Sequence, residues 1–443
     1  MRFFRSLYVS TRVWMALTGF ILLFITAYLV PALFAPVKLA LAVLAAVLVL
    51  EAVLLFRGRS SVFARREVPD RLSNGDDNPL TIYLESRYPF RVHLEVIDEI
   101  PVQFQKRDVL FQAALNPNET TAIRYELRPI RRGEYGFGAL NIYVMTPLRL
   151  LKRRFQFSQD KQVAVYPSFL QMRQYELLAI TNRLTELGIK KVRRIGHSME
   201  FEQVRAYTRG DDVRTINWKA TARRSDLMVN AFQEEKSQAV YCLIDKGRVM
   251  KSPFEGLSLL DYAINASLVL SNIALLKQDR AGLMTFSEKI GQTVVAERRP
   301  GHMQKILEVL YRQKTRFLES DYEALYTSVR THIRQRSLLL LFSNFETVNA
   351  LHRQLPYLRR LAKDHLLIVV FFENTELRSL LDGPADSTEA IYQKTIAEKF
   401  YYEKKLIVKE LQQYGIQTIL TAPQHLTADT VNKYLELKAR GMI

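Results

Sequence analysis

The spacing of apolar and polar residues changes along the chain, and the first region has the pattern of a membrane segment. Val13 to Val30 and Leu39 to Phe56 are apolar stretches, each about as long as a helix that crosses a bilayer. Pro31 and Pro36 lie between them and oppose a continuous helix. Residues 1–59 are therefore predicted to form a transmembrane helical hairpin.

Positive charge sets the expected orientation of this hairpin. Only Lys38 lies at its turn, whereas arginines flank both ends: Arg2, Arg5, Arg12, Arg57, Arg59, Arg65 and Arg66. Because cytoplasmic flanks carry the excess of Lys and Arg, both ends and everything after residue 57 are expected in the cytoplasm. A signal peptide cleaved near Ala35 is the alternative for the first stretch, whose apolar region is longer than such peptides normally have.

Residues 60–167 alternate apolar and polar positions with a period of two, as in Leu80 to Glu85 and Val92 to Ile97. Turn residues such as Asn116-Pro117-Asn118 separate these runs. The pattern predicts an antiparallel β-sandwich of immunoglobulin-like size. It contains no catalytic constellation, so its expected role is adhesion, or spacing between the membrane and the main domain.

Residues 237–443 alternate apolar strand-like runs with long helical ones. The expected strands are Val240 to Ile244, Ala281 to Phe286, Leu338 to Phe342, Leu366 to Phe372 and Ile416 to Leu420. Such alternation predicts a three-layer α/β domain with a mainly parallel sheet and helices on both faces. Ligands of such sheets bind beyond the carboxyl ends of the strands, which directs attention to Asp245 and to Ser343-Asn344.

Residues 168–236 are predicted to be a helix ending near Gly188, followed by a segment rich in charged and hydrogen-bonding side chains. Gly210-Asp211-Asp212 is a turn signal that would bring opposite charges together. We expect Arg–carboxylate pairs to pin a buried junction around Trp218; the alternative is an amphipathic hairpin with a charged outer face. The candidate interaction residues are Glu200, Arg205, Tyr207, Gly210, Asp211, Asp212, Arg214, Asn217, Trp218 and Arg223.

A long gapped pattern runs through this segment. It reads G-x-S-x-E-F from Gly196, then R-x-Y-x-x-G-D-D-x-R-x-I-N-W-x-x-x-A-R from Arg205, then L-x-V from Leu227. This pattern resembles the signature of the domain of unknown function 58 (DUF58) family of membrane-attached bacterial proteins. The resemblance implies the bacterial inner membrane as location and a von Willebrand factor A-like (Rossmann-like) fold for residues 237–443.

The same resemblance implies a metal-ion-dependent adhesion site, with D-x-S-x-S after the first strand, a hydroxyl from a middle loop and an Asp after the fourth strand. Asp245 is retained and Ser320 can supply the hydroxyl, but Gly247 and Val249 replace both serines and Asn344 replaces the final Asp. Because Mg²⁺ needs a full set of oxygen ligands, this set disfavours magnesium, and no cofactor is predicted. Asp245 would instead end its strand on Lys246, Arg248 or a backbone amide, or the two cations would bind an acidic partner.

Composition adds little other chemistry. The formal net charge of +18 suits nucleic acid or an anionic membrane, but acidic residues are mixed through the basic regions, which disfavours nucleic acid. Cys242, the single cysteine, lies in an apolar run and is expected to be buried. Glu51, in the second apolar stretch, is expected to snorkel or to meet Arg57; a proton relay is the less favoured alternative. The histidines have no paired ligand spacing.

Two functional hypotheses follow. The first is a membrane-anchored interaction or scaffold protein, not an enzyme, whose partner, by the resemblance, is a MoxR-type AAA+ ATPase acting in complex assembly, maturation or envelope maintenance. The alternative is a hydrolase that uses Glu200, Asp211, Asp212 and Asp245 as a metal-binding carboxylate cluster. Convergence of these carboxylates would favour the hydrolase.

Overall fold

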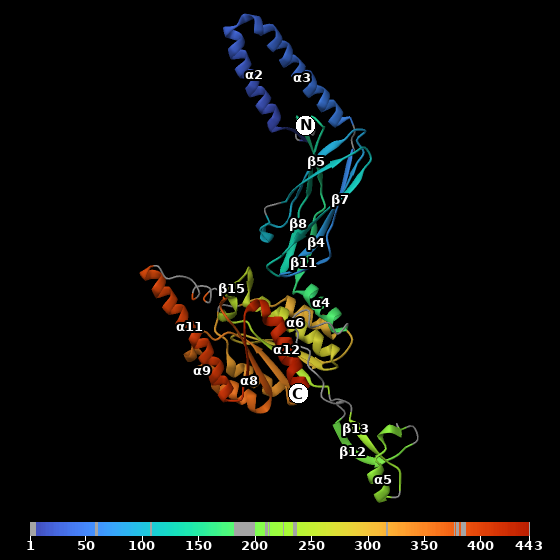
Figure 1. Cartoon of the computed structure of the whole chain (residues 1–443), viewed down its shortest axis with the longest axis vertical. Helices are drawn as coiled ribbons and strands as arrows, with labels where there is room; N and C mark the ends of the chain where they lie inside the picture. Colours follow the sequence, from blue (N-terminus) through green and yellow to red (C-terminus); the bar gives the residue numbers. More distant parts are fainter. Residues whose placement is uncertain are drawn as a thin grey trace. The chain divides into compact units, whose positions relative to one another are not determined.

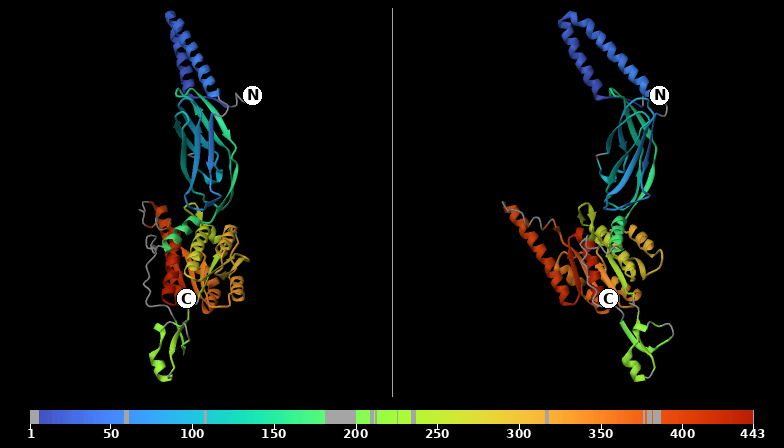
Figure 2. Two further views of the ribbon diagram at one scale, coloured as in Figure 1. Left: turned by 90° about the vertical axis from the view of Figure 1, so that its right-hand side faces the viewer. Right: turned by 45° about the vertical axis from the view of Figure 1, so that its right-hand side comes forward.

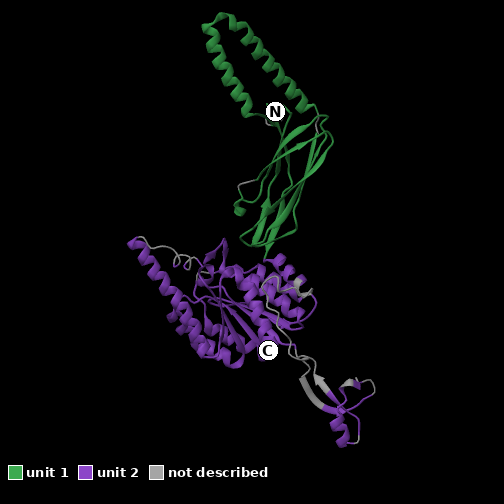
Figure 3. Ribbon diagram, in the orientation of Figure 1, with its two compact units in different colours: residues 1–166 green, residues 167–443 purple. Residues whose placement is uncertain are grey.

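The computed structural model describes residues 6–57, 61–106, 109–180, 200–208, 211, 213–224, 226–233, 237–315, 318–375, 377, 381 and 387–442. The chain divides into two compact units, residues 1–166 and residues 167–443 (Figure 3). The division falls beside the predicted end of the β-rich region. Each unit is described separately below.

Unit 1 begins with two apolar helices, α2 (Thr11–Leu29) and α3 (Phe34–Phe56), joined by a 3-10 turn at Pro31–Leu33 (Figure 1). Both are long and apolar enough to cross a membrane, and little of either is buried within the protein. The prediction that Pro36 lies outside the second helix was wrong. Pro36 is in the first turn of α3, where no intrahelical partner needs its missing N–H.

In unit 1 the strands adjoin the end of the helical hairpin (Figure 2). They enclose one apolar core, to which the end of α3 also contributes. Their alternating burial, for example along β5, follows from the period of two read in the sequence. The sheets have strand orders β1-β10-β9-β5-β6, β2-β4-β7 and β3-β11-β8. The strands are β1 (Leu7–Val9), β2 (Val62–Glu67), β3 (Arg71–Ser73), β4 (Asn78–Ser86), β5 (Val92–Asp98), β6 (Leu110–Leu115), β7 (Thr120–Leu127), β8 (Gly133–Phe137), β9 (Leu140–Met145), β10 (Leu151–Phe157) and β11 (Lys161–Tyr166).

Two features of unit 1 were not foreseen from the sequence. The short strand β1, which precedes the first helix, pairs antiparallel with β10. Arg66, which the sequence suggested as a flanking surface charge, is buried and forms an ion pair with Asp98. Since a buried cation needs its donors satisfied, the Arg66 guanidinium also donates to the carbonyl oxygen atoms of Gly138 and Gln159, at 2.9 and 2.8 Å.

Unit 2 is built on a six-stranded sheet of order β18-β17-β14-β19-β20-β21. All neighbouring strands are parallel except the edge strand β18, which pairs antiparallel with β17 and was not predicted. The strands are β14 (Ala239–Asp245), β17 (Arg280–Phe286), β18 (Ile290–Glu297), β19 (Leu338–Phe342), β20 (Leu366–Phe372) and β21 (Gln417–Thr421). A small hairpin, β15 (Pro253–Phe254) and β16 (Leu257–Ser258), precedes the first helix after β14.

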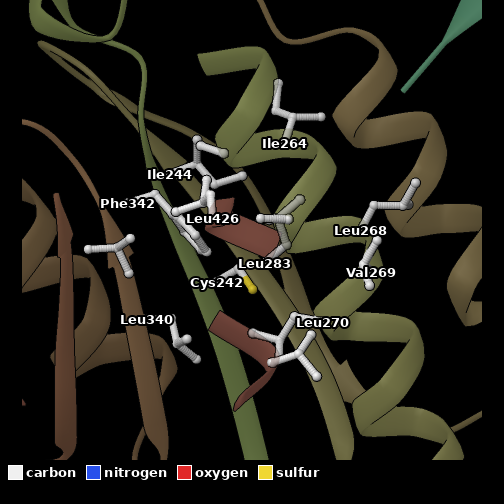
Figure 4. Packing of buried hydrophobic residues seen from close by; sticks show 14 of the residues in the cluster. Cys242, Ile244, Ile264, Leu268, Val269, Leu270, Leu283, Leu340, Phe342 and Leu426 are labelled. Carbon is white, nitrogen blue, oxygen red and sulfur yellow. The ribbon is translucent and has the colours of Figure 1, made fainter. Parts of the chain in front are cut away.

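Helices cover both faces of this sheet, as the alternation predicted. One core lies against α4, α6, α7 and α12, and the other against α8, α9 and α11. Cys242 lies in the first core among Leu270, Leu283 and Leu340, and burial raises the pKa of its thiol to about 12 (Figure 4). The helices are α4 (Phe169–Ile180), α6 (Leu259–Leu276), α7 (His302–Tyr311), α8 (Tyr322–His332), α9 (Val348–Asp364), α11 (Thr388–Gln413) and α12 (Leu426–Ala439).

Candidate functional site

Asp245 lies at the carboxyl end of β14, in the middle of the sheet, where ligands of parallel sheets bind. Only 1% of the residue is exposed. Its carboxylate accepts hydrogen bonds from the Ser343 hydroxyl at 2.7 Å, the Gly247 amide at 2.7 Å and the Ser320 hydroxyl. The predicted edge therefore brings together Asp245, Ser320 and Ser343.

Burial governs the electrostatics of this cluster. It raises the pKa of Asp245, although the hydrogen bonds from Ser320, Gly247 and Ser343 act in the opposite direction. Tyr322 lies 2.7 Å from the Ser343 hydroxyl, and burial raises its pKa well above the usual value. The cluster is thus a network of satisfied, buried groups, which stabilises one arrangement of the loops.

The cluster does not fit a magnesium site. Asn344, the third suggested ligand, accepts a hydrogen bond from the Lys404 ammonium, a cation that would repel a metal ion. A side chain at Gly247, where the adhesion motif has serine, would collide with the Ser320 hydroxyl. Among the described residues, no group of three or more His, Cys, Asp or Glu side chains could hold a metal ion.

Two pockets open at this edge of the sheet. A polar pocket of about 240 Å³ lies over Asp245, and its rim carries Glu319 with Arg248 at 3.2 Å and Arg353 at 3.6 Å. The other pocket, of about 280 Å³, is lined by apolar and aromatic side chains and by Lys404 of α11. Burial lowers the pKa of Lys404 to about 8. Lys404 was missed because neighbouring charged residues along this helix hide which one faces inward.

The signature segment forms a hairpin of β12 (Glu200–Ala206) and β13 (Met228–Gln233), connected through a 3-10 turn (Val213–Thr215) and α5 (Trp218–Arg224). Arg205 and Asp211 form a bidentate pair, with Nη1 to Oδ2 at 2.9 Å and Nη2 to Oδ1 at 2.6 Å; Arg–carboxylate pairs were expected here, but their partners were not predicted. The Arg205 guanidinium, and then the Thr208 amide, lower the pKa of Asp211 to about 2. This pair closes the loop after β12.

Asn217 holds the other side of the loop. Its side-chain oxygen accepts from the Ala220 amide at 3.0 Å and so caps α5, while its amide nitrogen donates to Asn230 Oδ1 at 2.8 Å. The expectation of a buried junction around Trp218 was wrong, because 70% of Trp218 is exposed. Val213 and Leu227 are also exposed, at 67% and 47%. The alternative reading, a hairpin with a polar outer face, was closer but did not foresee this apolar surface.

The remaining candidates of this segment are only partly described. Tyr207 is half-buried, and its amide donates to the Leu227 carbonyl at 2.8 Å; Arg223 is exposed in the last turn of α5. Gly210 and Asp212 lie outside the described residues, and for Glu200 and Arg214 only the backbone is described. Convergence of Glu200, Asp211, Asp212 and Asp245, which the hydrolase hypothesis requires, therefore stays a prediction.

Residues 203–390 match the model of the family described as "Protein of unknown function DUF58". This range contains most of the hairpin and the Asp245 cluster. The match assigns this part of the chain, residues 203–390, to the DUF58 family. The chain is 29% identical over 196 residues to the uncharacterized protein YeaD of Bacillus subtilis, a match that covers 42% of this chain and 48% of that relative's length.

The likenesses to solved structures are weak. The conserved hypothetical protein BatB of Bacteroides thetaiotaomicron aligns over 46% of this chain and 100% of its own, at 12% identity and a TM-score of 0.29. The CARDB domain of the PF1109 protein of Pyrococcus furiosus aligns over 24% of this chain and 86% of its own, at 13% identity and a TM-score of 0.17. These low TM-scores establish no shared fold.

Proposed function

We propose that this DUF58 protein is a membrane-anchored docking protein that presents its signature hairpin to a protein partner. One observation carries the proposal. The polar signature residues Arg205, Asp211 and Asn217 are used within the hairpin, which leaves Trp218, Val213 and Leu227 exposed. An exposed aromatic side chain on a pinned scaffold is the typical anchor of a protein interface.

The partner that we propose is a MoxR-type AAA+ ATPase, which acts with this chain in assembly or maintenance of envelope protein complexes. The support is the family signature, together with a sheet edge on which charged side chains surround the polar pocket over Asp245. Salt-bridged rim charges favour selection of a complementary partner more than they add affinity. The von Willebrand factor A-like identity of this α/β domain is part of the same proposal.

Quantitative co-purification from native membranes tests the docking surface. Full-length Trp218→Ser is expected to lose most of the co-purifying ATPase, because removal of an aromatic anchor typically costs about 2 kcal/mol or more of binding free energy. Val295→Ser is the matched control, since Val295 is an exposed apolar residue of β18 outside the hairpin. Equal recovery of the ATPase with both variants, or recovery of none with the wild type, would contradict the proposal.

The non-enzymatic reading is also part of the proposal and has its own test. The crowded, hydrogen-bonded surroundings of Asp245 support it. We expect magnesium to leave the melting temperature of the full chain unchanged. A rise that disappears in Asp245→Asn would favour the metal-assisted alternative.

A further inference from the structure

An apolar groove of about 260 Å³ lies at the foot of the helical hairpin in unit 1. One wall is the side of α3, with Val47, Leu50 and Leu54, and the other includes Phe90 and the turn at Pro147–Leu148. Leu50 is 59% exposed and Leu148 is 56% exposed, so the groove is open from outside the protein. The β unit alone does not form this groove, because α3 supplies a whole wall.

Hydrogen bonds fix the level of this groove along the helices. The Ser10 amide, just before α2, donates to the Leu150 carbonyl at 2.9 Å. The Leu150 amide donates to the Glu51 carboxylate of α3 at 3.2 Å. Leu150 is thus hydrogen-bonded both to the residue before α2 and to α3, at the point where the two helices reach the strands. In a bilayer crossed by α2 and α3, this level is the boundary between hydrocarbon and headgroups, since sheets with open edges do not enter the hydrocarbon.

Positive charge gathers beside the groove. Arg149 Nη2 lies 2.9 Å from His93 Nδ1, and Arg12 Nη1 donates to the Leu148 carbonyl at 3.2 Å. Burial, and then the charges of Arg149, Arg91 and Arg12, lower the pKa of His93, so the positive charge around this imidazole comes from three arginines. The Glu51 carboxylate is occupied by the Leu150 and Leu151 amides and the Thr146 hydroxyl.

We propose that this foot binds one anionic phospholipid, with an acyl chain in the groove and the phosphate on Arg91 and Arg149. Guanidinium groups match phosphate oxygens in pairs, and neutral His93 can orient Arg149 without adding a competing charge. Apolar walls beside clustered cations suit an amphiphile, whereas a soluble anion would leave the groove empty. The proposal rests on the membrane attachment proposed above but not on the ATPase.

Native mass spectrometry of the full-length chain in detergent, titrated with phosphatidylglycerol or phosphatidylcholine, tests this site. We expect one tightly retained phosphatidylglycerol and no equivalent phosphatidylcholine. Removal of the charges in Arg91→Gln with Arg149→Gln should weaken retention by about fivefold for each arginine. Arg131→Gln is the charge-matched control, because residue 131 lies at the opposite end of the β unit, near the β3–β4 turn.

A second variant distinguishes binding of a whole lipid from binding of a phosphate group alone. Leu50→Trp fills the groove and is expected to displace phosphatidylglycerol while the arginines remain. Equal retention of both lipids, equal weakening by Arg131→Gln, or competition by inorganic phosphate that Leu50→Trp does not alter would overturn the lipid assignment. An unchanged melting temperature without lipid verifies that the variants fold. Carbonate-resistant sedimentation with membranes tests the proposed membrane attachment. A failure of that proposal is therefore distinguishable from a failure of the lipid site.

Discussion

Helices α3 and α6 are both apolar enough to cross a membrane, yet the protein covers them very differently. In the most apolar part of the helical segment Pro31–Phe56, which contains α3, 11% of the residues are buried within the protein. In the most apolar part of α6 the share is 78%. Its own sheet and neighbouring helices surround α6, whereas most of α3 has no protein cover. Hydropathy thus specifies that a helix avoids water but does not specify whether protein or lipid replaces the water.

The ends of the two helices show what hydropathy does not record. α6 begins with a capping box, in which the Ser258 hydroxyl accepts from the Asp261 amide and the Asp261 carboxylate accepts from the Ser258 amide. α3 begins without a side-chain cap and ends inside the β unit, where the Tyr88 hydroxyl donates to the Leu55 carbonyl at 2.8 Å. The last turns of α3 are therefore packed against protein, whereas the rest of the helix exposes apolar side chains, as a membrane-spanning helix does.

The largest expected effect comes from placing a carboxylate in the middle of each helix. Val269→Asp buries an unpaired charge in the core of α6 and should destabilise unit 2 by about 4 kcal/mol or more. Val43→Asp, on the exposed side of α3, should leave the melting of unit 2 unchanged and weaken membrane insertion by about 3 kcal/mol. Calorimetry and membrane fractionation distinguish these outcomes. Similar loss of unit 2 stability in both variants would remove the contrast.

The half-buried cation Lys404 should give unit 2 a pH-dependent stability. The pKa is lowered from 10.5 to about 8 in the folded chain, so the unfolded chain binds more protons between these values. Stability should therefore rise by about 3 kcal/mol as the pH increases from 8 to 10.5, and the full penalty should be present below pH 8. Denaturant titrations should show this rise in the wild type and its absence in Lys404→Met. A parallel pH profile for the variant would refute the assignment.

Glu51 is a buried carboxylate of unit 1 whose described partners are all hydrogen-bond donors. Glu51→Ala leaves the amides of Leu150 and Leu151 without acceptors and should lower the unfolding free energy of unit 1 by about 2 kcal/mol. Glu51→Gln retains one acceptor oxygen and should lower the unfolding free energy of unit 1 by less than Glu51→Ala does. Thermal unfolding of the full chain in detergent measures both variants. Equal loss would mean that shape rather than hydrogen bonding matters.

The smallest effect is expected in the hairpin, which has neither a deep core nor lipid around its charges. The pKa of Asp211 is lowered, so its contribution is present above pH 3.8 and is lost as the pH falls towards 2. Hydrogen exchange of the Thr208 amide, which donates to Asp211 at 2.9 Å, should show reduced protection in Asp211→Asn at neutral pH. Protection equal to that of the wild type would show that the pair does not hold the loop.

Most elements could be predicted from the sequence because their periods are long and consistent. The alternation of strands and helices predicted the parallel part of the unit 2 sheet, and the mixed charges of the signature predicted Arg–carboxylate pairing but not which residues pair. Strands β1 and β18 were missed because one is only three residues long and the other pairs antiparallel at an edge.

The functional surfaces were harder to predict than the folds. The exposure of Trp218 was missed, since an aromatic residue among charges has the same pattern whether it anchors a core or an interface. Lys404 and the groove beside α3 depend on which side chains of distant segments meet. The spacing of residues along the chain does not specify which side chains of distant segments come into contact.

The pairing of β1 with β10 constrains how the protein is made. Leu7 aligns with Arg153, so β1, the first strand of the chain, is synthesised well before β10, the strand that it joins. Both α2 and α3 lie between these two strands in the sequence, so this edge can close only after both helices and the chain up to Arg153 have been made. A ribosome that has released only the helices therefore leaves β1 without its partner strand.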